Sequence, residues 1–251
     1  MKATKFIAAG VIGLIACTML GACVHYSTGK LASGKRSEKS IDVAMFNKLS
    51  VSNGIEVIFV QGPQTPVEIS CNEELIDRVV VKQKGKQLKI SIERERGFRI
   101  LDEKVRVSLQ AEALTEIDAS SGSQVKIWNG LALQGPLSAD ASSGSIINIQ
   151  SLKGAALKAD GSSGAVVNIE GIDVQTVEAD ASSGAVVTLA GKCNALEVDA
   201  SSGAVVNTGD LVAQKADVDS SSGAMVRTNG RESKVGGKHG SAKIGRASCR
   251  E

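Results

Sequence analysis

The chain has 251 residues, of which 42% are hydrophobic, and its formal net charge is +2. This length is enough for one elongated domain or two small ones. The charge is unevenly spread: residues 24–113 carry 15 basic and 12 acidic residues, whereas residues 114–229 carry 6 basic and 13 acidic ones. The acidic second half argues against a nucleic acid partner, because phosphate backbones are bound by basic surfaces.

Residues 1–22 have the pattern of a secretory signal peptide. Lys2 and Lys5 precede an apolar run from Phe6 to Leu20, which is shorter than the roughly 20 residues of a membrane span. Leu20-Gly21-Ala22-Cys23 follows and resembles a bacterial lipobox, in which the cysteine is lipidated; the alternative is an ordinary signal peptide with a chance cysteine. We expect lipid on Cys23 to anchor the chain in the cell envelope, as an outer membrane lipoprotein facing the periplasm or the cell surface. Residues 23–40 are predicted to form a solvated tether.

Residues 41–112 are predicted to form a β-rich N-terminal part. Ser52-Asn53-Gly54 is a turn signal between two apolar segments. The runs 79–81 and 88–92 flank Lys84-Gly85-Lys86, which predicts a hairpin. Asn72 could cap one helical turn that begins at Glu73.

Residues 113–230 repeat the phrase Asp-x-Ser-Ser-Gly six times, at spacings of 22, 20, 20, 19 and 20 residues. The repeated aspartates are Asp118, Asp140, Asp160, Asp180, Asp199 and Asp219. Apolar and polar residues alternate around each phrase, so that one side of each strand is expected to face inward, as at Val125, Ile127, Val167 and Ile169. The period predicts an all-β fold, a parallel β-helix (solenoid) of about 20-residue coils. Leucine-rich repeats need more leucines, and propeller blades need about 40 residues.

The phrase itself is predicted to be a structural turn. Glycine tolerates the positive φ angle of a tight corner, and we expect the Ser and Asp side chains to satisfy turn amides. Stacked coils place neighbouring carboxylates about 4.8 Å apart, at a cost of about 0.9 kcal/mol per pair in water. The alternative is a cation-binding ridge, since calcium prefers six to eight oxygen ligands. The phrase does not match the calcium-binding nonapeptide, so we expect neither a metal nor a cofactor.

No catalytic residues are predicted. The repeated aspartates all belong to the period, so none stands out as a poised acid, and the histidines His25 and His239 lie near the ends of the chain. Trp128, the only tryptophan, is expected to pack at the edge of the first coil. Cys71 and Cys193 could pair in an oxidising compartment or remain buried thiols.

A second column of residues on the outside of the coils is a candidate contact surface. This column is apolar and consists of Ile146, Val166, Val186, Val205 and Met225. A polar column lies beside it: Asn148, Asn168, Thr188 and Asn207. An exposed apolar stripe of this length marks a contact site. The alternative is that residues 41–112 or another sheet cover it.

The C-terminal end is predicted to be incomplete. Residues 231–243 have the pattern of a truncated last coil. Residues 244–251 resemble the translation of a sequencing adapter and are excluded from the fold.

The layout resembles the putative auto-transporter adhesin, head GIN domain family of Gram-negative envelope proteins. The residues that carry the resemblance are Phe46, Leu49, residues 51–57, the Gln61-Gly62 turn, Leu75, residues 88–90, residues 105–107 and the Ser-Ser-Gly repeats. The resemblance implies a β-rich envelope domain without established catalytic residues. We therefore expect a non-catalytic, lipid-anchored, adhesin-like binding module whose partner is an envelope or surface glycan or a protein. The alternatives are a rigid spacer without a specific ligand and a polysaccharide-active enzyme.

Overall fold

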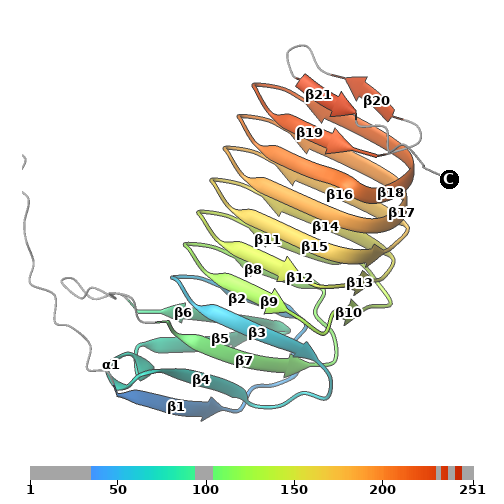
Figure 1. Ribbon diagram of the computed structural model, residues 1–251. Coiled ribbons are helices and arrows are strands. Elements are labelled where there is room, and N and C mark those ends of the chain that lie inside the picture. Colours follow the sequence, from blue (N-terminus) through green and yellow to red (C-terminus); the bar gives the residue numbers. More distant parts are fainter. Residues whose placement is uncertain (1–34, 94–103, 230–232, 237–240, 245–251) are drawn as a thin grey trace, which may run out of the picture.

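The computed structural model describes residues 35–93, 104–229, 233–236 and 241–244, and it is built almost entirely from β-strands. Successive coils lie over one another to form a rod, and the N-terminal part closes one end of it (Figure 1). The predicted all-β parallel β-helix of about 20-residue coils is confirmed. Among the described residues, no helix is long and apolar enough to cross a membrane.

Each coil contributes a strand to two long parallel sheets. The first sheet contains β2 (Lys48–Val51), β8 (Glu116–Ala119), β11 (Leu137–Ala141), β14 (Ala156–Gly161), β16 (Thr176–Ala181), the later parts of β17 (Val186–Ala200) and β18 (Val205–Ser220), and β20 (Ser233–Gly236). The second contains β3 (Glu56–Gln61), β9 (Gln124–Ile127), β12 (Ile146–Ile149), β15 (Val166–Asp173), the earlier parts of β17 and β18, β19 (Met225–Thr228) and β21 (Ser241–Ile244). The short strands β10 (Leu131–Ala132) and β13 (Leu152–Lys153) lie at the third corner.

The N-terminal part extends both sheets. Strand β6 (Gln87–Ile92) pairs with β2 in parallel, and β5 (Val79–Lys84) pairs with β6 as the predicted hairpin. Strand β7 (Arg106–Ala111) pairs with β3, β4 (Val67–Asn72) pairs antiparallel with β7, and β1 (Arg36–Ile41) pairs antiparallel with β4. The helical turn α1 (Glu73–Ile76) begins at Asn72, whose side chain accepts the Glu74 amide at 2.9 Å, as predicted. The predicted tether, however, ends too late, because residues 36–40 belong to β1.

The inward side of each coil forms one continuous core. Val125, Ile127, Val167 and Ile169 are fully buried, which confirms the register read from the alternation. Each such aliphatic side chain contributes about 1.5–3 kcal/mol when it leaves water. The core therefore holds the rod together by contacts between consecutive coils.

The Ser-Ser-Gly turns stack through their main chains. In one of them, Ser163 has φ 51° and Gly164 has φ 71°, both in the left-handed region that a type I′ turn requires. The Ala165 amide closes this turn on the Ser162 carbonyl at 3.1 Å, and the Gly164 amide donates to the Ser183 carbonyl of the next coil, also at 3.1 Å. The glycine amide is thus satisfied by main chain, and the serine before the glycine also takes a positive φ, which the sequence did not predict.

The same turn ladder begins in the N-terminal part. Asn53 and Gly54 have φ 67° and 76°, and the Gly54 amide donates to the Ser121 carbonyl at 3.1 Å. Strands β2 and β3 are therefore the first rung beneath the six repeats. The boundary predicted at residue 113 is a boundary of sequence pattern and not a break in the solenoid.

Candidate functional site

The repeated aspartates form one vertical file on the outside of the first sheet, which we call the aspartate face. The strand registers pair Asp118 with Asp140, and then each aspartate with the next as far as Asp219. The strand spacing places neighbouring members about 4.8 Å apart. A second file of outward residues runs beside it: Glu116, Ser138, Lys158, Glu178, Glu197 and Asp217.

The contacts of the aspartates differ from those expected. Asp118 accepts the Ser50 hydroxyl at 3.1 Å, Asp140 accepts the Ser138 hydroxyl at 3.0 Å, and Asp180 lies 3.1 Å from the ammonium of Lys158. In the described part of the chain, none of the six carboxylates accepts a backbone amide. The interpretation of Asp as an acceptor for turn amides is wrong, because the adjacent coil satisfies those amides.

The aspartate face is electrostatically unfavourable for the isolated chain. The pKa of Asp140, Asp160 and Asp199 is raised above its usual value, first by burial and then by neighbouring carboxylates of the ladder. Lys158 lies between Glu178 and Asp180, and both carboxylates raise the pKa of its ammonium group. One lysine on the central coils leaves most of the negative charge uncompensated.

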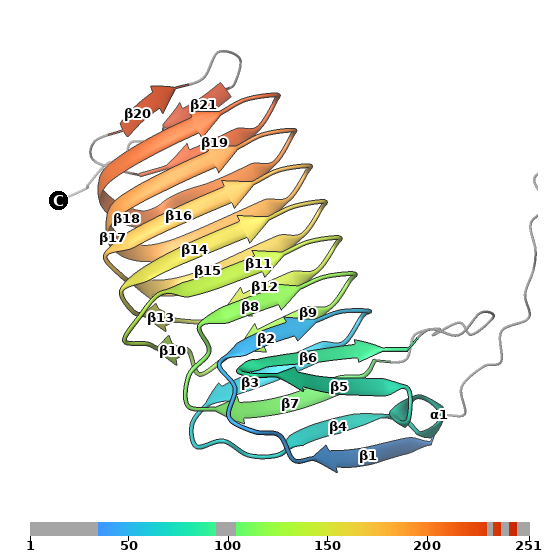
Figure 2. The same cartoon turned by 180° about the vertical axis from the view of Figure 1, so that it is seen from behind.

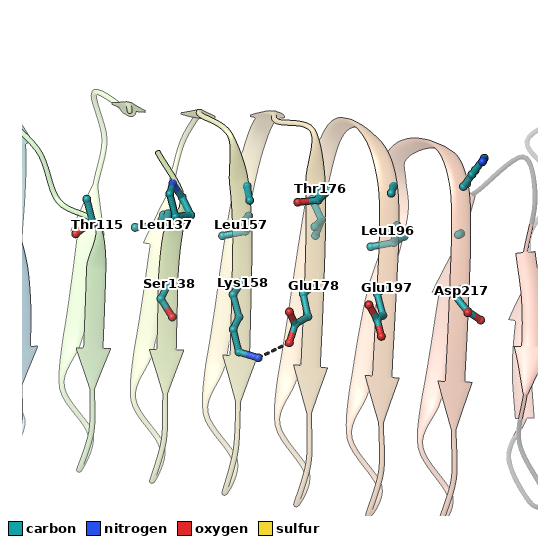
Figure 3. Close-up of a pocket in the computed structure, with 16 residues that line it drawn as sticks. Thr115, Leu137, Ser138, Leu157, Lys158, Thr176, Glu178, Leu196, Glu197 and Asp217 are labelled. Atoms are coloured by element: carbon teal, nitrogen blue, oxygen red, sulfur yellow. Dashed lines mark hydrogen bonds and ion pairs between the residues drawn. The ribbon is translucent and has the colours of Figure 1, made fainter. Parts of the chain in front are cut away.

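Two hollows follow this face. The larger, of about 1130 Å³, runs from Thr115 to Asp217 across the beginnings of the strands (Figure 3). Figure 3 shows Ser138, Lys158 and Glu178 in one row across consecutive strands, with the Lys158–Glu178 ion pair between two of them. The smaller hollow, of about 450 Å³, lies over the aspartate and serine files of the last coils, around Asp180 and Asp199. Among the described residues, no three His, Cys, Asp or Glu side chains are grouped so that they could hold a metal ion.

The apolar stripe lies on the outside of the second sheet, which we call the stripe face. Its five members pair in register along the rod: Ile146, Val166, Val186, Val205 and Met225. The first four are half-buried by their own neighbours in the sheet, and Met225 is 55% exposed. The described part of residues 41–112 lies at the end of the rod and does not cover the stripe (Figure 1).

Other residues singled out by sequence fall in three places. Trp128, at the N-terminal end of the stripe face, is 54% exposed, so the expectation that it packs at the coil edge is wrong. Cys71 and Cys193 are buried and do not form a disulfide. The predicted lipidation site Cys23, the signal peptide and most of residues 244–251 lie outside the described residues.

These features define the class of the protein: a β-solenoid with two chemically different long faces and a β-rich cap. The chain belongs to the putative auto-transporter adhesin, head GIN domain family, whose sequence profile matches residues 45–245. This confirms the resemblance. Among curated proteins, none matches the chain by sequence.

Solved structures share the fold. A putative adhesin from Parabacteroides merdae ATCC 43184 has a TM-score of 0.72 at 16% identity, over 86% of this chain and 98% of its own. A putative adhesin from Parabacteroides distasonis ATCC 8503 has 0.71 at 17% identity, over 85% and 98%. A putative lipid binding protein from the latter organism has 0.70 at 13% identity, over 86% and 94%. Identities this low support the shared fold and nothing finer.

Proposed function

We propose that the protein is a non-catalytic, adhesin-like binding module of the cell envelope, held at a membrane by lipid on Cys23. The family description and the names of two structural neighbours, each called a putative adhesin, support a surface or envelope role. The lipobox at Cys23 supports the anchor. The proposed partner is an envelope or surface glycan, or a protein, bound on the stripe face.

The observation that carries this proposal is the apolar stripe, which no described segment covers, beside a polar column. Asn148, Asn168, Thr188 and Asn207 lie two residues further along each strand, on the same side of the sheet as the stripe. Apolar contact area next to regularly spaced amides and a hydroxyl suits a ligand that has both apolar and hydrogen-bonding surface. Neither column carries a charge from Ile146 to Asn207, so a neutral ligand is not repelled there.

The test is a substitution in the stripe with a matched control elsewhere. Lysine at Val166 and Val186 places two charges in the middle of the stripe, whereas Val212→Lys places one on a valine that is 55% exposed outside it. Binding to glycan arrays and to isolated envelope fractions should fall for V166K/V186K and stay unchanged for V212K. Equal loss in both variants, or binding that neither changes, rejects the stripe as the contact site.

A rigid spacer is the second candidate, and the regular stacking of coils favours it. Consecutive coils pair in register from β8 to β18, which makes a stiff rod with no interruption in its first sheet. If the protein is a spacer, V166K/V186K should not change its function, and it should bind no envelope component. Its function should then require only the length of the rod. A variant in which one coil is deleted, residues 160–179, tests this: envelope function should depend on rod length and not on the stripe.

A further inference from the structure

The aspartate face continues beyond the acidic coils onto a strongly basic end. Strand β6 pairs with β2 so that Lys89 lies in register with Ser50, which itself lies in register with Asp118. In the hairpin, Lys82 lies directly opposite Lys89, and Lys84 lies opposite Gln87, so all three lysines point outward on this face. Figure 2 shows β5, β6, β2, β8, β11, β14 and β16 along one side of the rod.

The basic end has no ion-pair partner among the residues that the structure describes. Lys82 and Lys89 form a like-charge pair across the hairpin, which is unfavourable. Lys82, Lys84 and Lys89 are exposed, and none of them makes an ion pair with any described residue. The hairpin therefore presents positive charge that no described residue neutralises.

The other end of the same face has the opposite charge and likewise lacks ion pairs among the described side chains. The outward residues of the last two coils are acidic, and none of them makes an ion pair with a described residue: Glu197, Asp199, Asp217 and Asp219. Lys215 lies at the corner of β18 on this face, and β20 continues the sheet beyond β18 with Lys234 in register with Asp217. One sheet face thus carries a positive pole at β5 and β6 and a negative pole at β17 and β18.

We propose that this bipolar face pairs with the same face of a second copy of the chain, with the two rods antiparallel. The strands of this face follow the order β5, β6, β2, β8, β11, β14, β16, β17, β18 and β20, and the proposed pairing uses the first nine. A two-fold axis along β11, the fifth strand, places β5 over β18, β6 over β17, and β2 over β16 of the other copy. The lysine hairpin of each copy then faces the acidic end of the other, and each contact is made twice, as two-fold symmetry requires.

The central strands make both favourable and unfavourable charge contacts in this arrangement. The same axis places β8, with Glu116 and Asp118, over β14, where Lys158 accompanies Asp160. Glu116 then faces Lys158, Asp118 faces Asp160, and Ser138 and Asp140 of β11 meet their own copies at the axis. A parallel pairing places every strand over itself, so that acids face acids and lysines face lysines along the whole face. Charge complementarity therefore selects the antiparallel orientation.

The size of the face indicates a weak and reversible pair. Eight strand spacings of about 4.8 Å and strands of about 17 Å give about 650 Å² per copy, slightly below the roughly 800 Å² of a standard interface. The contacts are exposed charges, which salt screens. If the proposed lipid anchor is correct, the antiparallel pair places the two anchors at opposite ends, as contact between two facing membranes requires; the pairing itself does not depend on the anchor.

Sedimentation of the purified protein at about 0.01 M and about 1 M salt tests the pairing, since the Debye length is about 30 Å in the first and about 3 Å in the second. We expect a monomer–dimer equilibrium at low salt and monomer at high salt. The variants K82E/K84E/K89E and E197K/D199K/D217K should each weaken the homodimer more than about tenfold. An equimolar mixture of the two variants should recover the dimer, because the reversed hairpin of one then faces the reversed end of the other. Glu170→Lys, an exposed reversal on the stripe face, is the matched control and should leave pairing unchanged.

The axis makes a second, geometric prediction. Ser138 lies on β11, so the thiols of two Ser138→Cys copies meet at the two-fold axis. At low salt they should form a disulfide-linked dimer when added diamide takes up the two electrons and two protons, whereas Glu197→Cys should not. Monomer at low salt, or unchanged pairing by the reversed variants, overturns the proposal. Failure of the mixture to recover the dimer, or selective cross-linking of Glu197→Cys, overturns the antiparallel register.

Discussion

Replacing Asp199 by asparagine should stabilise the folded monomer. Asp199 lies between Asp180 and Asp219 in the ladder and has no cationic partner among the described residues. A neighbour at about 4.8 Å costs about 0.9 kcal/mol in water, so two neighbours cost about 1.7 kcal/mol. Screening reduces this value and relief of partial burial adds to it. We therefore expect a gain of about 1–2 kcal/mol, or a rise of a few degrees in Tm.

The pH dependence follows from the direction of the pKa shift. The pKa of Asp199 is raised in the folded chain, by burial first and by Asp180 and Asp219 next. A raised carboxyl pKa means that the charged form destabilises the fold at neutral pH, and that this cost disappears as the pH falls through the folded pKa towards the unfolded one. The advantage of D199N should therefore be present at pH 7, shrink as the pH falls, and be nearly absent at about pH 3, below the unfolded pKa of about 3.9.

Urea denaturation of the monomer at low salt measures the effect, with Asp210→Asn as the control. Asp210 is exposed and its partner in the adjacent strand is Ala190, so removing its charge relieves no ladder repulsion and should change stability by less than about 0.5 kcal/mol. A clear loss of stability in D199N with no change in D210N refutes the reasoning. Such a result means that the carboxylate accepts stabilising hydrogen bonds or binds a cation.

Other substitutions test the cap and the corners. The carboxylate of Glu56, which is 7% exposed, accepts hydrogen bonds from Lys126 at 2.5 Å and from Arg106 at 3.3 Å, and Lys126 is the main cause of its lowered pKa. Urea denaturation should therefore show that E56Q costs about 2 kcal/mol of stability above pH 5. The difference between the two proteins should shrink as acid protonates Glu56. A Cβ on Gly191 meets backbone atoms of the adjacent coil at 2.3 Å, whereas a Cβ on Gly203 meets no atom within 4 Å. Both glycines have a positive φ that strains alanine, so G191A should lower Tm more than G203A by the cost of its additional clash. Burial raises the pKa of Cys193 to about 11, so a thiol reagent at pH 8 should label it only after unfolding.

The repeat could be predicted from sequence because one local pattern repeats without interruption. Equal spacing of Asp140, Asp160 and Asp180 requires equal coils, and alternation around Val167 distinguishes inside from outside. The first rung was missed although Ser50-Val51-Ser52-Asn53-Gly54 has the same turn chemistry as the repeated phrase. The aspartate is replaced by Ser50 and the second serine by Asn53, so a search for the phrase passes over it.

The charge distribution of the aspartate face could not be predicted because it depends on pairing across the chain. Lys89 belongs to β6, which begins about forty residues after β2 in the sequence. In the fold, β6 nevertheless pairs directly with β2. In the sequence, the lysines of the hairpin appear only as part of a basic first half. The exposure of Trp128 was missed for a related reason, since alternation places it on the outer side but says nothing about what covers it.

The aspartate ladder and the lysine hairpin each lower the stability of the monomer. The aspartate face either tolerates this repulsion or relieves it by pairing with a second copy, and one substitution distinguishes these two hypotheses. If repulsion within the ladder is simply tolerated, D199N stabilises the fold and changes nothing else. If the face pairs with a second copy, D199N removes one charge opposite the hairpin, so the same substitution should stabilise the monomer and weaken the low-salt dimer. Two readouts of one variant moving in opposite directions cannot arise from a general loss of folding. A dimer that D199N strengthens in step with the fold requires a different contact surface.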